Sequence, residues 1–218
     1  MRPARALTTL VVALWAAAFG RDGFDRWVDA TNLPVLLSET SVEVRDRDGQ
    51  LLRAYTVADG LWRLGARPKA VDPTYRTMLI AYEDQRFDHH AGVDPLAMVR
   101  AVGQAVIHGE VVSGGSTLSM QVARLLEDGS TGRWQGKIRQ MRVALALERR
   151  LSKDDILTLY LTHAPYGGNI DGVRAATLAW FGKEPTRLTA AQSALLVALP
   201  QSPETPRPDL NPEAAPAP

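Results

Sequence analysis

The sequence lacks cysteine altogether and has no excess of charge of either sign. None of its 218 residues is a cysteine, which excludes disulfides, thiolate nucleophiles and cysteine-ligated zinc. The absence suits an oxidising periplasm, although many cytosolic proteins lack cysteine too. The 25 basic and 24 acidic side chains leave a net charge of +1. A general affinity for nucleic acid is therefore excluded, and positive charge can act only locally.

The N-terminus carries the pattern of an export segment. Two arginines within the first five residues precede fifteen uncharged residues, 6–20. This run has the length of a signal peptide's apolar region and falls short of the roughly 20 residues of a spanning helix. We predict an export segment over 1–20 and favour an uncleaved transmembrane anchor, because bulky Trp15 and Phe19 flank the small residues that a cleavage enzyme needs. A buried helix of the fold is the alternative.

The rest of the chain is predicted to form one globular domain, with 45% hydrophobic and 22% charged residues. A connector over 21–40 precedes this domain at 41–203, and a proline-rich disordered tail over 204–218 follows it. Alternation at 41–45, a turn at Asp48-Gly49 and a return at 51–55 predict a small β hairpin. The remainder is predicted to be mainly α. Helices are expected from Asp72-Pro73 onward and then over 95–107, 117–126, 136–151, 153–162, 172–180 and 189–199.

An acidic cluster at the end of the first of these helices is one candidate site. Glu83 ends the helix, where the helix dipole and partial desolvation both disfavour the charged carboxylate. Such a group suits a general base working near neutrality. A surface glutamate near a helix end is the simpler interpretation. The residues that follow Glu83 within one turn and loop favour a catalytic site. They are Asp84, Phe87, His90 and Asp94.

A glycine turn is the second candidate. Gly114-Gly115-Ser116-Thr117 precedes a helix, so its N–H groups and hydroxyls can face an anion at the helix N-terminus. A plain helix cap is the alternative. Gln121 lies one turn on from Thr117, on the same face, and Arg124 follows. The turn lacks the lysine of a Walker loop, so nucleotide phosphate is not implied. A zinc site is also disfavoured, because His89 and His90 are adjacent and point apart.

Basic side chains gather in the segment 133–153, which holds seven of them against one acid, Glu148. A solvated charged face is the ordinary interpretation of such a run. However, Lys137, Gln140, Ala144 and Glu148 fall on one stripe at helical spacing, and such a stripe could line a groove. The local excess of positive charge suits a pyrophosphate or anionic lipid head groups.

Three spaced motifs together resemble one family over about residues 42–203. They resemble glycosyltransferase family 51, the peptidoglycan glycosyltransferase domain of class A penicillin-binding proteins and monofunctional transglycosylases. Several motifs in the same order make the resemblance specific. The motifs are Glu83-Asp84-x-x-Phe87-x-x-His90-x-Gly92, Gly114-Gly115-Ser116-Thr117 with Gln121, and Ser152-Lys153-x-x-Ile156-Leu157-x-x-Tyr160-Leu161.

The resemblance implies a lysozyme-like α fold and the polymerisation of lipid II into glycan strands, with inversion and release of undecaprenyl pyrophosphate. Glu83 would be the base that deprotonates the acceptor's sugar 4-hydroxyl. The other implied residues bind substrate: Asp84, Phe87 and His90 around the base; Gly114, Gly115, Ser116, Thr117, Gln121 and Arg124 along the donor groove; and Lys137, Arg139 and Arg142 near the pyrophosphate.

One position departs from the family pattern. Gln140 stands where many members carry a second catalytic glutamate, and an amide cannot donate or take a proton in that role. It can only hydrogen-bond the pyrophosphate or a metal-bound water. Glu148 lies about 12 Å further along the helix axis, too far to substitute. The expected mechanism therefore has one carboxylate, Glu83, with Gln140 at the second catalytic position and cations stabilising the leaving group.

The resemblance also implies partners and a location. The partners are lipid II, the growing glycan strand and the cytoplasmic membrane, with the catalytic domain in the periplasm behind a single-pass anchor. No cofactor is required, and a divalent cation, Mg²⁺ or Mn²⁺, is left open. No transpeptidase Ser-x-x-Lys or Lys-Thr-Gly box occurs, which predicts a truncated member that relies on a separate transpeptidase. A non-catalytic lipid II-binding remnant and a lysozyme-like glycan-cleaving enzyme are the alternatives; a neutral glycan needs no pyrophosphate cradle.

Overall fold

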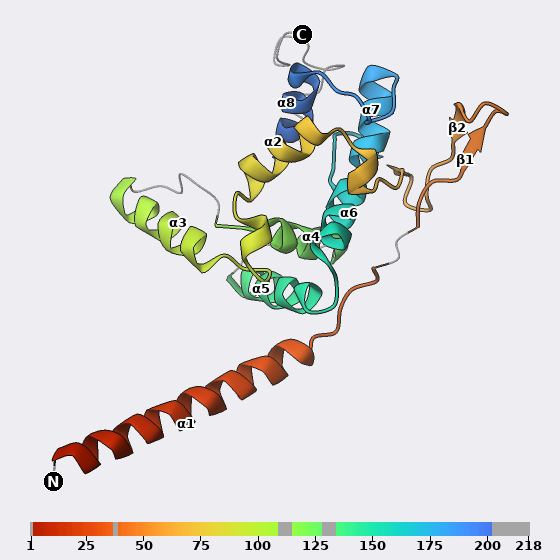
Figure 1. Ribbon diagram of the computed structural model, residues 1–218. Helices are drawn as coiled ribbons and strands as arrows, with labels where there is room; N and C mark the ends of the chain where they lie inside the picture. Colours follow the sequence, from red (N-terminus) through yellow and green to blue (C-terminus); the bar gives the residue numbers. More distant parts are fainter. Residues whose placement is uncertain (1, 37–38, 109–114, 128–133, 202–218) are drawn as a thin grey trace.

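The computed structural model describes residues 2–36, 39–108, 115–127 and 134–201. This part of the chain is mainly helical, as predicted (Figure 1). Gly114 and the tail predicted over 204–218 lie outside the described residues. The helices are α1 (Arg2–Asp29), α2 (Pro73–Glu83), α3 (Pro95–His108), α4 (Leu118–Leu126), α5 (Trp134–Glu148), α6 (Lys153–His163), α7 (Val173–Phe181) and α8 (Ala190–Ala198), with 3-10 turns η1 (Pro68–Ala70), η2 (Phe87–His89) and η3 (Leu199–Gln201).

Local capping explains where several helices begin. The Asp72 carboxylate accepts a hydrogen bond from the Thr74 N–H at the start of α2, and Pro73 takes the first helical position. Capping boxes start α6 and α8. Helix α5 ends at Glu148, three residues before its predicted end at 151. The reason is that Ser152 must adopt an extended conformation to cap α6, so the helix before it has to close first.

Helix α4 lies at the centre of the helical body. It packs against both α5 and α6, while α2 packs against α8. Leu118 and Val122 of α4 are buried with Leu147 of α5 and Leu161 of α6 in the main core. The apolar residues on its buried face remove several side chains from water, each worth roughly 1.5–3 kcal/mol. The N-terminus of α4 is therefore held in a fixed place, and the candidate site lies there.

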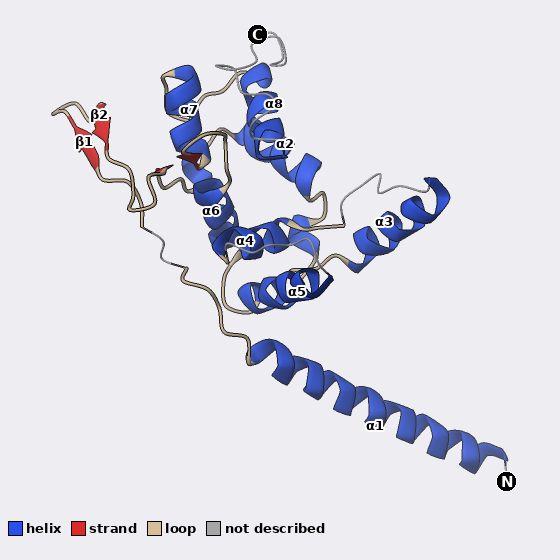
Figure 2. Ribbon diagram, turned by 180° about the vertical axis from the view of Figure 1, so that it is seen from behind, coloured by secondary structure: helices blue, strands red, loops and turns tan. Residues whose placement is uncertain are grey.

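Two small sheets complete the described fold (Figure 2). Strands β1 (Glu43–Arg45) and β2 (Leu51–Ala54) pair antiparallel, which confirms the predicted hairpin. Strands β3 (Trp62–Arg63) and β4 (Ile170–Asp171) pair in parallel. The Arg63 guanidinium supports the second pairing with an ion pair to Asp171 at 2.8 Å. No prediction covered this pairing, because two residues are too few to show a period.

Helix α1 leaves the body and extends away from it (Figures 1 and 2). It continues to Asp29, so the first part of the predicted connector, residues 21–29, is helical. Contacts with α5 and with the residue after it hold this stretch: Arg149 pairs with Asp25 and Asp29, and the Arg142 guanidinium of α5 lies 4.8 Å from the Trp27 ring centroid. Within the described residues, no helix has both the length and the apolar character needed to cross a bilayer. The predicted membrane segment over 1–20 is not confirmed.

Candidate active site

A cleft of about 810 Å³ opens where the end of α2 meets α3 and the start of α4. The loop at Pro165 and the turn at Pro200 close it from the C-terminal part of the chain. The main polar side chains that line it are those of Glu83, Asp84, Gln85, Arg86, Asp94, Arg100, Gln104, Ser116, Thr117, Gln121, Arg124 and Gln201. The structure thus brings Glu83 together with the Ser-Thr pair, Gln121 and Arg124, as the sequence predicted.

Glu83 is the half-buried last residue of α2. Each of its carboxylate oxygens accepts a hydrogen bond from a glutamine amide. The Gln121 amide on α4 lies 2.7 Å from Oε2, and the Gln201 amide on η3 lies 2.5 Å from Oε1. Two donors on different oxygens hold the carboxylate in one orientation. The geometry therefore suits a base that is oriented and ready to take a proton.

Asp84 joins the Glu83 loop to the N-terminus of α4. Its buried carboxylate accepts hydrogen bonds from the Leu118 N–H at 2.9 Å and from His90 Nε2 at 2.9 Å. The other ring nitrogen, Nδ1, accepts from the Gly92 N–H at 3.1 Å. With Nδ1 as the acceptor, Nε2 carries a proton and donates it to Asp84. Asp84 and His90 brace the loop that positions Glu83.

Thr117 both caps α4 and fixes this loop. Its hydroxyl accepts from the Met120 N–H at 3.1 Å and donates to the Gly92 carbonyl at 2.6 Å. Gly92 has a φ of +102°, and a Cβ there would lie 2.6 Å from the Ala144 carbonyl oxygen of α5. Only glycine allows so close an approach. The helix-cap interpretation of Thr117 is confirmed, and the same residue also lines the cleft.

Lys137 reaches the cleft edge from α5. Its amine donates a hydrogen bond to the Ser116 hydroxyl, which lines the cleft. Burial lowers the pKa of the Lys137 amine, and the charge of nearby Arg124 lowers it further. Gly115 lies close by, where a Cβ would come 3.3 Å from Met98 Cα of α3. The lysine, the arginine and the hydroxyl thus form one positively charged edge.

Glu148, the acid of the predicted stripe, supports the site from outside the cleft. Glu148 accepts hydrogen bonds from the Ser119 hydroxyl at 2.5 Å and from the Lys153 amine at 2.7 Å. Lys153 also donates to the His90 carbonyl at 2.7 Å and lies 4.5 Å from the centre of the Phe87 ring. These contacts tie the loop of Glu83 to α5 and α6. Phe87, His90 and Glu148 are not among the residues that line the cleft.

Three other predicted residues of α5 also lie outside the cleft lining. Arg139 pairs with Glu127 at 2.6 Å and donates to the Asn32 carbonyl, and Arg142 donates to the Trp27 carbonyl. Gln140 is buried, and within the described residues its Nε2 has no hydrogen-bond partner. The expectation that Arg139 and Arg142 approach the pyrophosphate therefore finds no support in the positions of their side chains.

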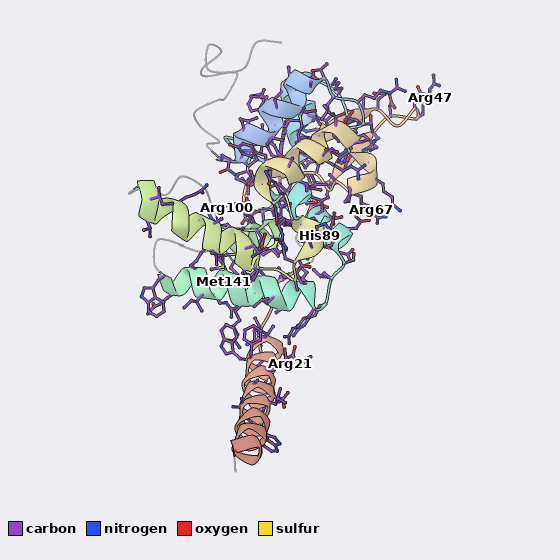
Figure 3. All side chains as sticks on the ribbon, turned by 60° about the vertical axis from the view of Figure 1, so that its left-hand side comes forward. Arg21, Arg47, Arg67, His89, Arg100 and Met141 are labelled. Carbon is purple, nitrogen blue, oxygen red and sulfur yellow. The ribbon has the colours of Figure 1, made fainter. Side chains whose placement is uncertain are left out.

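The structure adds residues that the sequence reasoning missed. Arg100 (labelled in Figure 3) and Gln104 line the cleft from α3, together with Ala97. Their spacing of three and four residues places them on one helix face, a signal that was available in the sequence. Arg86 lines the cleft as well, and Gln201 had no local signal because it lies 118 residues after Glu83.

Three buried tyrosines lie close enough to Glu83 to respond to its charge. Burial raises the pKa values of Tyr75, Tyr160 and Tyr166, and the negative charge of Glu83 raises each of them further. The Tyr75 and Tyr166 hydroxyls are 2.7 Å apart and hydrogen-bonded. All three phenols are therefore neutral, and they form the protein interior beneath the base.

Apart from Glu83, the acidic side chains of the cleft lining, Asp84 and Asp94, are engaged by other groups of the protein. Within the described residues, no three His, Cys, Asp or Glu side chains gather in a way that could hold a metal ion. Of the two acids closest to Glu83 in the cleft lining, Asp84 is engaged by His90 and by α4, and Asp94 caps α3 through the Leu96 N–H. The positive charge at the cleft comes from lysine and arginine.

Comparison with known proteins defines the class. The sequence profile of the family described as transglycosylase matches residues 48–217. The chain belongs to this family, which confirms the resemblance drawn from the motifs. It is 45% identical to penicillin-binding protein 1C of Escherichia coli (strain K12) over 204 residues, which are 94% of this chain and 26% of that protein.

Two further relatives are more distant. Penicillin-binding protein 1F of Bacillus subtilis (strain 168) is 33% identical over 179 residues, which are 82% of this chain and 24% of that protein. Penicillin-binding protein 1A of Aquifex aeolicus (strain VF5) is 38% identical over 136 residues, 62% of this chain and 19% of that protein. The chain therefore spans about a quarter or less of the length of these relatives.

Proposed function

We propose that this chain is a peptidoglycan glycosyltransferase with a lysozyme-like fold, which polymerises lipid II into glycan strands and releases undecaprenyl pyrophosphate. Membership of the transglycosylase family supports the reaction class. The observation that carries the proposal is the pairing, in one cleft, of an oriented carboxylate with a positively charged edge. Glu83 is held by two amides, and Arg100, Arg124 and Lys137 lie around the same opening or at its rim.

In the proposed mechanism, Glu83 takes the proton of the acceptor's sugar 4-hydroxyl. The oxygen then attacks the anomeric carbon of the donor, whose bond to the pyrophosphate oxygen breaks with inversion. The electron pair of that bond leaves on undecaprenyl pyrophosphate. Arg100, Arg124 and the Lys137–Ser116 pair stabilise the negative charge as it develops.

The mechanism needs only one carboxylate. Asp84 is bound by His90 and by the α4 N-terminus, and Glu148 is paired with Lys153. Gln140 is buried and carries no titratable group. Leaving-group stabilisation therefore falls to cations, which remain charged without proton transfer. No step is assigned to a divalent cation.

We place the active cleft on the periplasmic side of the cytoplasmic membrane, with residues 1–20 as the anchor. Two arginines before an uncharged run support this orientation. A separate transpeptidase would cross-link the strands that the chain makes. Fractionation of cells that carry a tagged chain, followed by a high-salt and alkaline wash, tests the anchor. Release of the intact chain by the wash would contradict it.

The direct test is polymerisation of lipid II by the detergent-solubilised chain, with glycan strands separated on a gel. Glu83→Gln is run beside it. Strands from the wild type alone support a glycosyltransferase that uses a single carboxylate. Equal activity in the mutant would show that Glu83 is not the base.

A second candidate is a non-catalytic lipid II-binding remnant, favoured by the amide at Gln140. It predicts a folded circular-dichroism spectrum and lipid II binding without strands. A glycan-cleaving enzyme would instead shorten purified glycan strands. Incubating the chain with such strands therefore distinguishes cleavage from polymerisation.

A further inference from the structure

Gln201 contacts the carboxylate that the proposed function uses as its base. Its Nε2 donates to Glu83 Oε1 at 2.5 Å, although the two residues are 118 positions apart. Gln201 is the last residue of η3, and both it and Pro200 line the cleft. The preceding Leu199 is fully buried. The backbone that carries the amide is therefore anchored in the core, whereas the side chain itself is exposed.

The two amides on Glu83 come from different elements of the fold. Gln121 belongs to the central helix α4 and binds Oε2, and Gln201 follows α8 and binds Oε1. The packing of α2 against α8 brings the η3 turn beside the end of α2. One donor alone would leave the carboxylate free to rotate about its terminal bond, whereas two donors on different oxygens fix its plane.

Building on the proposed function, we propose that Gln201 is a positioning residue of the reaction, which fixes the plane of the Glu83 carboxylate. The donated hydrogen bond is stronger for a carboxylate than for a neutral acid. Removing the amide should therefore favour protonation of Glu83. A cation in its place should disfavour protonation, and a second carboxylate should favour it most strongly.

Other titratable or charged groups lie near the same carboxylate and are kept constant in this test. They include the three buried tyrosines beneath it and the charged groups of the cleft lining. The tyrosines are Tyr75, Tyr160 and Tyr166, and the charged groups of the cleft lining are Asp84, Arg86, Asp94, Arg100 and Arg124.

The kinetic test measures the pH dependence of lipid II polymerisation by the full chain in detergent. Gln201→Ala is expected to lower kcat about five- to tenfold with KM changed less than twofold, in keeping with the loss of one hydrogen bond to a charged group. The acid limb of the profile should move up by roughly half to one pH unit for Gln201→Ala and further for Gln201→Glu, and down for Gln201→Lys.

The matched controls are the same three substitutions at Gln50, which directly precedes β2 in the distant hairpin and contacts Asp46 through its backbone. These variants should keep the wild-type profile. A merely structural role of Gln201 would lower kcat without moving the limb in the order of the introduced charge, and that result would overturn the proposal.

A second readout does not need activity. In chain labelled with ¹³C-glutamate, the Glu83 carboxyl signal is the one that Glu83→Gln removes, and it is titrated in the wild type, Gln201→Ala and Gln201→Lys. The titration midpoint should rise with alanine and fall with lysine. Equal midpoints in all three would overturn the positioning role, even if strands are made. The chain could also make no glycan strands while its titration midpoints still rise with alanine and fall with lysine. That result would support the contact between Gln201 and Glu83 and contradict only the proposed function.

Discussion

The two faces of α5 carry similar polar side chains but contact different parts of the molecule. One face meets the site: Lys137 binds Ser116, Ala144 touches Gly92, and Glu148 binds Ser119 and Lys153. The other face meets α1 and the segment after it through Arg139 and Arg142, and Arg149, directly after the helix, also binds α1 (Figure 3, where Arg21 marks α1 near this contact). A basic run in a sequence can therefore belong to two surfaces with different roles.

The difference between the faces lies in what neutralises the charge. On the α1 face, Arg139 and Arg149 are paired with carboxylates. In the cleft, within the described part of the chain, Arg100 and Arg124 have no ion pair with a carboxylate. A cluster of cations without counter-charges attracts an anionic ligand, whereas a paired cluster holds two segments together. Cations that bind a ligand and cations that dock a segment thus lie on the two sides of α5.

The largest effect is expected where α5 touches the Glu83 loop. Gly92→Ala should cost about 3–4 kcal/mol of unfolding free energy, because the new Cβ meets the Ala144 carbonyl of α5 at a positive φ. Chemical denaturation measures the loss. Gly103→Ala in α3, where a Cβ meets nothing within 4 Å, is the control and should stabilise by up to about 1 kcal/mol. Equal stabilities would show that the loop does not rest on α5.

The next effect concerns charge on the two faces. Lys137→Ala should lower kcat/KM for lipid II roughly 100-fold, the usual cost of removing one group that stabilises a developing anion. Arg142→Ala, on the α1 face, should change it less than about twofold. Steady-state polymerisation assays measure both. If Arg142→Ala proved the more damaging variant, the division of α5 into a site face and a docking face would be wrong.

A pH experiment sharpens the same division. Burial and Arg124 lower the pKa of Lys137, so this amine loses its charge at a lower pH than a free lysine. Activity that depends on the charge is present below that pKa and falls as the pH rises through it. Lys137→Arg should therefore move the alkaline limb of the rate profile to higher pH. If the alkaline limb does not move, it reflects the titration of a group other than Lys137.

The smallest effect is expected on the α1 face. Arg149→Ala removes ion pairs to Asp25 and Asp29 that are well exposed to solvent, so the loss of stability should stay below about 1 kcal/mol. Hydrogen exchange should become faster over residues 21–29 and remain unchanged over 134–148. Unchanged exchange over 21–29 would mean that the cation–π contact of Arg142 with Trp27 is enough to hold α1.

Local chemistry could be predicted from the sequence. Asp72, Thr117 and Thr189 cap their helices, and Glu83 ends its helix, because each of these depends on residues within one turn. The stripe of Lys137, Ala144 and Glu148 also faces the site, since helical spacing alone decides which side chains share a face.

Contacts between distant segments could not be predicted. The amide of Gln201 reaches Glu83 only because α8 packs on α2. Arg139 and Arg142 turn away from the cleft because Glu127, Asn32 and Trp27 offer them acceptors, and nothing in the basic run itself indicates those partners. Periodicity identifies a face of a helix, and tertiary packing decides what covers it.

The short parallel pairing of β3 with β4 has a consequence for how the chain matures. The Trp62 N–H donates to the Asn169 carbonyl at 2.8 Å, so this bond cannot form until more than a hundred further residues have been synthesised. Long-range pairings of this kind form slowly, because the intervening loop must close first. We expect the Trp62 amide to be among the last to gain protection from hydrogen exchange during refolding. Its protection would therefore report when folding of the domain is complete.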